Sequence, residues 1–217
     1  MTSVDDYANW RGVTPQRVRQ LLRSGELPGR RIGSRQWIVD DAAFNSRVRV
    51  ARPMAPPMAW GLIAMLGGEE PAADLTPVQR SRLREHRNKL VRLEDGAPAL
   101  LASWVRLRGE RLVYQVAPAD IADLSHDARL MKSGVSDPRA GISATGVTEV
   151  WLRHFTDLDE IVGDYLLLPD PKGQVVMHRG REHESEQPQI GLVMADLADW
   201  NSPREDARVI ELLARVR

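Results

Sequence analysis

The chain of 217 residues contains no cysteine and only two phenylalanines, and lysine is scarce, with three residues against 27 arginines. Without cysteine, disulfide bonds and thiolate metal sites are excluded. No apolar run reaches the length of about 20 residues that a membrane-spanning helix needs; the longest is MAWGLIAML, at residues 58–66. The N-terminal sequence MTSVDDYANW lacks the basic and apolar segments of a signal peptide. We therefore expect a globular, cytoplasmic protein without a membrane partner.

The formal net charge is zero, but the charges are distributed unevenly along the chain. Residues 1–50 contain nine arginines and five acidic residues, a net charge of +4, and residues 51–217 have a net charge of −4. Net charge bears on the choice of partner more than on the fold. The basic N-terminal segment therefore indicates an anionic partner.

A change in composition at ARPMAPP (residues 51–57) divides the chain, because three prolines in seven residues do not continue a helix. We predict an N-terminal domain at 1–50 with three short helices and a hairpin, a proline-rich linker at 51–57, and a mixed α/β domain at 58–217. Residues 180–188 are expected to form an exposed loop. The predicted helices of the second domain cover 58–66, 77–93, 97–106, 118–124, 158–165 and 203–217, and its predicted strands cover 111–117, 149–153, 173–178 and 189–195.

Residues 14–25, TPQRVRQLLRSG, predict a short amphipathic helix with a polar outer face. Thr14 is a typical N-cap, Pro15 suits the first helical position, and Gly25 suits the end of the helix. The apolar face consists of Val18, Leu21 and Leu22. The opposite face presents Gln16, Gln20 and Arg23, with Arg17 and Arg19 at its flanks. Glutamine and arginine make bidentate contacts with adenine and guanine edges in the major groove of DNA.

The residues that follow predict a basic β-hairpin. Gly33-Ser34 suits a type II′ turn, which places Arg31 and Arg35 near the tip of the hairpin. The side chains expected to pack inward are Ile32, Trp37 and Val39. A helix at 4–10 and a turn at 11–13 come first, so the order is that of a helix-turn-helix followed by a wing, whose basic tip reaches phosphates or a minor groove. The alternative is that these arginines form a solvated helix face.

Residues 3–48 resemble the winged helix-turn-helix of excisionases and of the MerR group. The matching residues are Gly12-Val13-Thr14, Val18, Leu21-Leu22, Gly25, Leu27-Pro28, Ile32-Gly33 and Ile38. The chain departs from the family pattern at Asn9-Trp10, where small and aliphatic residues are expected. We therefore expect an α+β fold class, with a small N-terminal winged helix-turn-helix before a mixed α/β domain with a short-stranded sheet. The expected DNA-binding residues are Thr14, Gln16, Arg17, Arg19, Gln20, Arg23, Arg30, Arg31 and Arg35.

Catalysis is the main alternative for the second domain. His178 and His183 lie five residues apart, but zinc ligands on a helix prefer a spacing of four, and the sequence offers no clear third ligand. Asp196 and Asp199 have the chemistry to hold Mg²⁺, yet they are more simply explained as the end of a strand that leads into a turn. The stretch 132–134 (KSG) lacks the glycines of a phosphate-binding loop, and no serine lies in a nucleophile elbow. We predict no enzyme, no metal site and no cofactor.

A second basic stretch follows Pro77. On the helix predicted there, Glu85 is the only acidic residue between positions 79 and 93. The basic residues are Arg80, Arg82, Arg84, Arg87, Lys89 and Arg92, of which Arg80, Arg84 and Arg87 share one face. This helix is either a solvated element with Val78, Leu83 and Leu90 facing the core, or the continuation of a DNA footprint, or a site for an acidic or RNA-containing partner.

Residues 120–138, 149–169 and 190–213 resemble the C-terminal domains of actinobacterial antitoxins that are encoded beside nucleotidyltransferase toxins of the abortive-infection E type. The similarity lies mostly in hydrophobic patterning. It implies a protein that represses its own operon and counteracts the toxin. After position 93 the chain has 14 basic and 21 acidic residues, so the basic antitoxin surface of that family is not obvious here.

We expect a sequence-specific autorepressor that binds double-stranded DNA and acts as the antitoxin of a nucleotidyltransferase toxin. A single module has a small footprint, so two copies are expected on an inverted repeat, as a homodimer on DNA with half-sites about one helical turn apart. Two alternatives remain. One is a regulator whose second domain senses a small ligand in a concave apolar pocket, and the other is an excisionase-like architectural factor that bends DNA.

Overall fold

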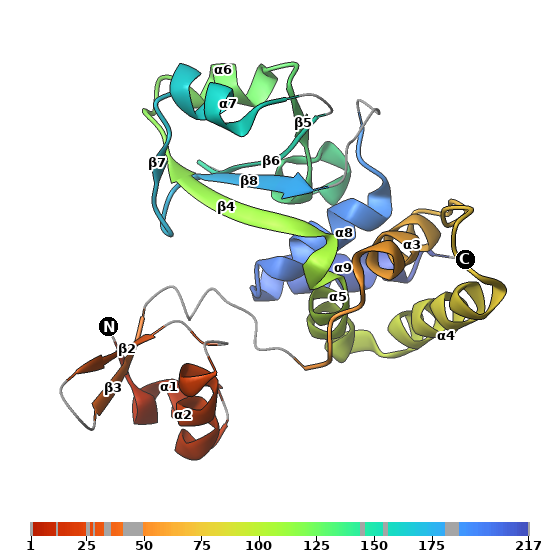
Figure 1. The fold of residues 1–217 in the computed structure, drawn as a ribbon, viewed down its shortest axis with the longest axis horizontal. Helices are drawn as coiled ribbons and strands as arrows, with labels where there is room; N and C mark the ends of the chain where they lie inside the picture. Colours follow the sequence, from red (N-terminus) through yellow and green to blue (C-terminus); the bar gives the residue numbers. More distant parts are fainter. Residues whose placement is uncertain are drawn as a thin grey trace.

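The computed structural model describes most of the chain as helices and two β-sheets (Figure 1). The described residues are 2–11, 13–24, 27, 29–32, 36–40, 50–143, 146–153, 156–180 and 187–216. The fold is a mixed α/β arrangement with short strands, as the sequence predicts. Within the described ranges, no helix combines the length and apolar character needed to cross a membrane. The longest apolar run forms part of α3, a helix of 11 residues (Pro56–Leu66).

The N-terminal elements are two helices and a three-stranded sheet in the order β1-β3-β2, here called the N-terminal unit. Their bounds are Thr2–Ser3 (β1), Val4–Arg11 (α1), Pro15–Arg23 (α2), Gly29–Ile32 (β2) and Gln36–Val39 (β3). The three strands are antiparallel, with Gly29 opposite Val39 and Arg31 opposite Trp37. Two predicted helices and the paired strands of the predicted hairpin are confirmed. Residues 41–49 lie outside the described ranges, and with them any third helix in that stretch.

Five further helices form a layer on one side of the larger sheet (Figure 1). They are α3, Pro77–Arg92 (α4), Ala97–Val105 (α5), Ile190–Asp199 (α8) and Pro203–Leu213 (α9). α3 begins at Pro56, two residues before the predicted start, because proline fits the first turn of a helix. The backbone before it is also attached to this layer. The N–H of Val50 donates to Ser103 Oγ at 3.0 Å, and the N–H of Met54 donates to the Trp104 carbonyl at 2.9 Å. The division of the chain into two domains stays a prediction.

The larger sheet has five strands in the order β5-β6-β8-β4-β7. The strands are Gly109–Gln115 (β4), Leu130–Lys132 (β5), Thr148–Leu152 (β6), Leu168–Pro169 (β7) and Val175–Gly180 (β8). β6 and β8 are parallel, and every other neighbouring pair is antiparallel. Two short helices, Ile121–His126 (α6) and Leu158–Asp164 (α7), lie on the side opposite the helical layer (Figure 1).

Alternation along β6 and β8 gives the sheet two buried faces. Val150 and Met177 point toward α6 and α7, where they join one hydrophobic cluster. Trp151 points the other way, toward α8, and joins the cluster of the helical layer. Every residue of β6 is buried, which is expected for a strand covered on both faces. The core is therefore a three-layer arrangement with the sheet in the middle.

The predicted strand at 189–195 is wrong, because these residues begin α8. The run IGLVMADLAD is buried over positions 191–198 and lies between the sheet and other helices, so nearly every side of the helix is apolar. Periodicity does not distinguish such a helix from a buried strand. Two very short strands, β5 and β7, were not predicted from the sequence. Glu205, in the predicted final helix, is buried in the first turn of α9.

Candidate nucleic-acid interface

The local sequence fixes where α2 begins and which way it faces. Thr14 has extended backbone, and its hydroxyl oxygen accepts a hydrogen bond from the Arg17 backbone N–H at 3.3 Å. Pro15 occupies the first turn, where a backbone N–H has no partner within the helix. The predicted N-cap is thus confirmed, and the Thr14 hydroxyl already serves the helix. Burial of Val18, Leu21 and Leu22 turns the opposite face of α2 outward.

The outer face of α2 carries the polar side chains that the sequence assigns to it. The exposed residues are Gln16, Arg17, Arg19, Gln20 and Arg23. Arg17 Nη1 donates to Gln20 Oε1 at 3.0 Å, so these two side chains already lie together. Arg19 Nη2 is 3.8 Å from a carboxylate oxygen of Asp5 on α1, and both side chains are exposed. An ion pair this long and this exposed is weak, so Arg19 remains accessible to another anion.

α1 supports α2 through a small buried contact. Tyr7 and Ala8 are fully buried beside Val4. The N–H of Val13 donates to the Ala8 carbonyl at 3.0 Å, which closes the connection between the two helices. Asn9, one of the two departures from the family pattern, is exposed and leaves this packing undisturbed. The side chain of Trp10, the other departure, lies outside the described part of the structure.

The hairpin β2–β3 packs against α2 at the end where Val39 is buried. A Cβ on Gly29 would clash with the Leu22 side chain and with the Ile38 carbonyl, so only glycine allows this close approach. Arg30 and Arg31 follow on β2 and are exposed. The hairpin therefore presents two basic side chains to solvent on the strand that begins at this close approach.

The far end of the hairpin differs from the prediction. Ile32 is 46% exposed, so the expectation that it packs inward is wrong. It lies opposite the exposed Gln36, at the end of the strand pair away from the buried cluster. Trp37 is half-buried against that cluster, and Val39 is fully buried, as predicted. The predicted turn at 33–34 and the basic residue after it, Arg35, lie outside the described ranges.

α4 carries the second basic surface, and its helix is firmly anchored. Gln79 N–H donates to Thr76 Oγ1 at 3.3 Å and Thr76 N–H donates to Gln79 Oε1 at 2.8 Å, a reciprocal capping box. Leu83 and Leu90 are buried, as predicted. Val78 is 62% exposed, so the prediction that it faces the core is wrong. It lies in the first turn, five residues before Leu83, the first buried residue of α4, and this spacing puts the two side chains on different faces of the helix.

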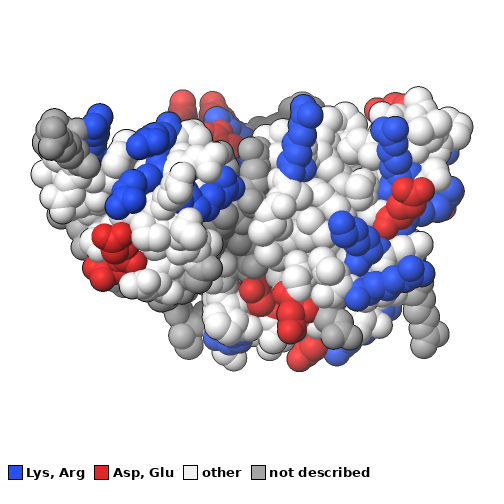
Figure 2. Space-filling view, turned by 90° about the horizontal axis from the view of Figure 1, so that it is seen from below, with Lys and Arg blue, Asp and Glu red and all other residues white. Residues whose placement is uncertain are grey.

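Only one of the three arginines predicted to share a face of α4 is fully presented to solvent. Arg84 is exposed, whereas Arg80 and Arg87 are half-buried, and Arg80 Nη2 donates to the Ala73 carbonyl at 2.9 Å. The exposed cations of α4 are Arg82, Arg84, Lys89 and Arg92. Figure 2 shows Lys and Arg side chains over the N-terminal unit at the left and again at the right, on the side where Figure 1 places α4.

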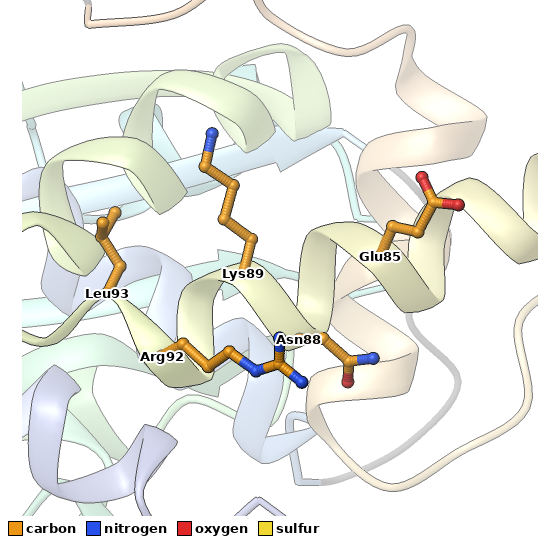
Figure 3. A pocket seen from close by; sticks show the side chains of 5 residues that line it. All are labelled: Glu85, Asn88, Lys89, Arg92 and Leu93. Carbon is orange, nitrogen blue, oxygen red and sulfur yellow. The ribbon is translucent and has the colours of Figure 1, made fainter.

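A shallow groove runs along α4 and is lined by Glu85, Asn88, Lys89, Arg92 and Leu93. Figure 3 shows that these side chains project to both sides of the helix, with Lys89 on one side and Asn88 and Arg92 together on the other. A small molecule is normally held by groups that converge on it in a concave site. The outer surface of α4 lacks that arrangement.

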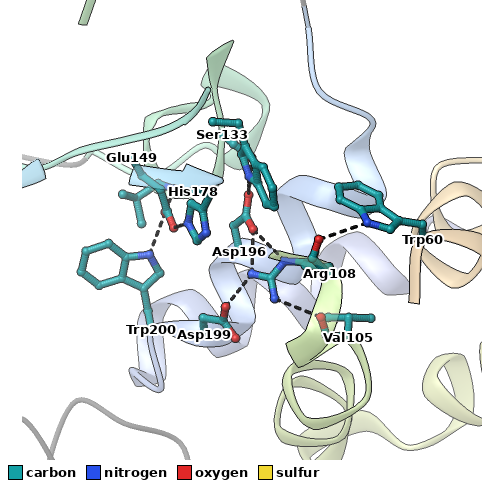
Figure 4. A network of polar contacts seen from close by, with 11 residues as sticks. Trp60, Val105, Arg108, Ser133, Glu149, His178, Asp196, Asp199 and Trp200 are labelled. Carbon is teal, nitrogen blue, oxygen red and sulfur yellow. Dashed lines mark hydrogen bonds and ion pairs between the residues drawn. The ribbon is translucent and has the colours of Figure 1, made fainter. Parts of the chain in front are cut away.

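Sequence reasoning missed a buried polar network between the sheet and α8 (Figure 4). Asp196 accepts hydrogen bonds from Arg108 Nη2 at 2.8 Å, from Trp151 Nε1 at 2.8 Å, and from the Ser133 hydroxyl. Arg108 also pairs with Asp199. The two aspartates therefore lie on a helix and are held by an arginine, so the prediction that they end a strand is wrong.

Mutual charge controls the protonation of this network. Burial alone would lower the pKa of Arg108, but the carboxylates of Asp199 and Asp196 raise it above its usual value. Burial alone would raise the pKa of Asp196, but His178 and Arg108 hold it below its usual range. Both groups therefore stay charged over the ordinary pH range.

The other half of the network joins Glu149 to His178, from neighbouring strands. His178 Nε2 lies 2.9 Å from Glu149 Oε1, and Trp200 Nε1 donates to Glu149 Oε2 at 2.8 Å. The His178 ring stacks on Trp151, with centroids 4.9 Å apart and planes 14° from parallel. A charged residue inside an apolar run, as in TEVWL and IGLVMADLAD, is the sequence signal of such a network, because buried charges are normally paired.

This network has the chemistry of a scaffold. Its carboxylates already accept several hydrogen bonds each, and Glu149, His178 and Asp196 are buried. His183, the second histidine weighed above, lies outside the described ranges. Among the described residues, no group of three or more His, Asp or Glu side chains is arranged to hold a metal ion.

A cleft with a volume of about 1090 Å³ lies beside α3. Its apolar lining includes Trp60 and Leu192, and Glu69, Glu70 and Asp74 supply carboxylates. The Glu69 carboxylate accepts a hydrogen bond from the Gln189 amide, which joins the cleft's α3 side to the start of α8. The cleft is concave and part apolar, which is the arrangement that a small ligand needs.

Known proteins offer no closer guide to either basic surface or to the cleft. No family model, no curated protein and no solved structure matches the chain.

Proposed function

We propose that the chain is a sequence-specific DNA-binding protein and that its N-terminal unit acts as a winged helix-turn-helix. The observation that carries the proposal is the exposed Gln and Arg face of α2, together with the exposed Arg30 and Arg31 on the hairpin of the same unit. α2 has nine residues, a length of about 14 Å at about 1.5 Å per residue. That length suits a major groove about 12 Å wide.

The side chains divide by reach and chemistry. Gln16, Gln20 and Arg23 lie on the side of α2 opposite its buried residues and are proposed to contact base edges. Arg17 flanks this side and supports Gln20 through the hydrogen bond between them. The proposed phosphate contacts are Arg19, Arg30 and Arg31, and the sequence adds Arg35 to them.

Two variants separate these roles. Binding to duplex DNA is measured by fluorescence anisotropy at salt concentrations from about 50 to about 200 mM, where affinity that depends on phosphate contacts falls steeply. Arg31→Ala should weaken binding to all sequences alike and reduce the slope of log K against log salt by about one unit. Gln20→Ala should leave the slope unchanged and relax the preference at one base pair. Binding that is insensitive to salt in the wild-type protein would contradict the proposal.

Autorepression and antitoxin activity extend this proposal and rest on the resemblance of the second domain to actinobacterial antitoxins. Co-expression with a nucleotidyltransferase toxin of the abortive-infection E type tests this part. Rescue of growth by the wild-type chain is the expected result. A failure to rescue growth from such toxins would remove the antitoxin role and leave the proposed DNA binding intact.

A small-ligand sensor is a second candidate because of the cleft beside α3. A ligand that binds only the folded state raises its melting temperature. A thermal-shift screen of the wild-type protein against Trp60→Ala tests this function. Compounds that raise the melting temperature of the wild type and not of the variant would favour a sensor. If no compound does so, the sensor function is contradicted.

A further inference from the structure

We propose that α4 is a second phosphate-binding surface that contacts the same DNA duplex as α2. This inference rests on the proposed DNA-binding function and adds a partner for a helix that the winged helix-turn-helix does not include. Three properties of α4 carry it: cations without an ion-pair partner among the described residues, a helix fixed in place, and side chains that project to both sides of that helix.

The exposed charge of α4 has no local counterpart. Within the part of the chain that the structure describes, Arg82, Arg84 and Arg92 form no ion pair. Arg80 and Arg84 are four residues apart, a spacing at which like charges weaken a helix. Glu85 is the only acidic residue in the helix. A solvated helix normally mixes both signs of charge, so this composition favours an external anion.

The helix is also held in place before any partner binds. The capping box at Thr76 fixes its start, and Leu83 and Leu90 anchor it to the core. Near its end the Lys89 ammonium lies 5.7 Å from the Trp104 ring centroid, and the His86 ring meets the same tryptophan edge-on at 4.4 Å. Because the backbone is fixed, binding orders only the side-chain ends, which lowers its entropic cost.

The shape and chemistry of the surface favour duplex phosphates over other anions. The side chains along the groove on α4 project to both sides of the helix (Figure 3), so their charges match an extended polyanion better than a small one. Single-stranded nucleic acid is usually held by exposed aromatic side chains, but Trp104 is buried, with the His86 ring edge-on against it. α4 has 16 residues, or about 24 Å, which spans several phosphates of a duplex.

Tethering explains how two modest surfaces act together. The stretch 41–49 between the N-terminal unit and the rest of the chain has nine residues and extends over at most about 32 Å. Once α2 is on DNA, α4 meets the same duplex at a high effective concentration. The lysines and arginines seen on one side of the molecule in Figure 2 are compatible with contact along one duplex.

The test compares two sets of three substitutions that remove the same charge from the full chain. The α4 set is Arg82→Gln, Arg84→Gln and Arg92→Gln, and the control set is Arg52→Gln, Arg106→Gln and Arg215→Gln, all at exposed positions. Lys89 is left unchanged because it packs over Trp104. Binding to a random-sequence 30-base-pair duplex is measured against salt, and circular dichroism checks that each variant is folded.

The α4 set is expected to reduce the slope of log K against log salt by about two to three units, at about 0.9 per lost phosphate contact. The control set should change it by less than about half a unit. Glu85→Gln removes the one acidic residue of the helix and is expected to strengthen binding by a few fold. This gain cannot arise from a failure to fold.

Equal slopes for the two sets, or no gain from Glu85→Gln, would overturn the proposal for α4. A loss confined to 30-nucleotide single-stranded or duplex RNA would replace DNA by RNA as the partner and also overturn it. The proposed function of the N-terminal unit can fail separately. If Arg31→Ala leaves duplex binding unchanged while the α4 set abolishes it, α4 is the DNA-binding surface. The assignment of DNA binding to the N-terminal unit would then be wrong. If the wild-type chain does not bind duplex DNA, both proposals fall.

Discussion

Arg108 and Asp196 form an ion pair that is nearly closed to solvent, with side chains 3% and 0% exposed. A buried pair of this kind contributes little over a well-packed apolar pair, but removing one partner leaves the other charge buried and unpaired. Asp199 shares the arginine, and its side chain is 21% exposed. Among these three residues, Arg108 is the one whose loss leaves two carboxylates without their cation.

Arg108→Met should lower the free energy of unfolding by about 3–5 kcal/mol. Arg179→Met is the matched control, because Arg179 pairs with Glu110 where both side chains are about half exposed (53% and 52%). Its loss should cost less than about 1 kcal/mol. Urea unfolding of the two variants measures the difference. Equal losses of unfolding free energy would show that burial of the Arg108 ion pair does not increase the cost of breaking it.

Asp127 makes stability depend on pH at the acidic end. The Arg129 side chain donates to its carboxylate at 2.7 Å, and with further hydrogen bonds, one of them from Tyr165, this lowers the pKa of Asp127 to about 2. The unfolded pKa is about 3.9. Because the folded pKa is the lower one, the stabilisation is fully present above about pH 4 and is lost as pH falls toward 2.

Asp127→Asn should therefore lower the free energy of unfolding by about 1–2 kcal/mol at pH 7. The difference from the wild type should shrink between pH 4 and pH 2, a window set by the folded value of about 2 and the unfolded value of about 3.9. Denaturant unfolding at several pH values checks this, with Asp95→Asn as an exposed control. A difference that stays constant down to pH 2 would contradict the assigned pairing.

At the scale of elements, α8 depends on a close approach to α3. A Cβ added to Gly191 would clash with the Ile63 carbonyl and approach the Gly67 nitrogen to 3.0 Å. Gly163, within α7, has no atom within 4 Å of the corresponding position. The two glycines thus allow the same substitution to be compared with and without a neighbouring backbone.

Gly191→Ala should destabilise the protein by about 1–3 kcal/mol through overpacking. Gly163→Ala should stabilise it by up to about 0.5–1 kcal/mol, because alanine is the better helix former. Thermal unfolding of both variants measures these two changes in stability. If Gly191→Ala were neutral, α3 and α8 would be able to separate more easily than their packing indicates.

Local signals predict elements well where they are complete within a few residues. Thr14 before Pro15, and Thr76 before Pro77, correctly mark the starts of α2 and α4. The outer face of α2 is equally local, since its angular spacing alone separates buried from exposed side chains. The prediction of secondary structure fails where burial on nearly every side removes the local pattern, as in the helix at 190–199.

The polar network could not be predicted because its members are distant in the chain. Arg108 and Asp196 are 88 positions apart, and Glu149 and His178 are 29 apart. A sequence shows that a charge lies in an apolar run, but not which partner the fold will bring to it. The same limit applies to α4, where the sequence names the cations and only packing shows which are exposed.

Across the whole molecule, opposite charge is divided between the two ends of the chain. The first 50 residues have a net charge of +4 and the remainder −4. α4 is the exception in the acidic part, with basic residues and one acid. Repulsion between the acidic part of the chain and the DNA phosphates would confine close contact to the N-terminal unit and α4. This repulsion between exposed charges extends over about 10 Å at moderate salt.

The most direct measurement of sequence-specific reading is selection of bound sites from a random duplex library by the full chain and by Gln20→Ala. The account predicts a consensus for the wild type with two half-sites about one helical turn apart. It predicts that Gln20→Ala yields the same half-sites with one base pair in each no longer specified. An unenriched library, or an identical consensus from both proteins, would contradict the claim that the outer face of α2 reads DNA.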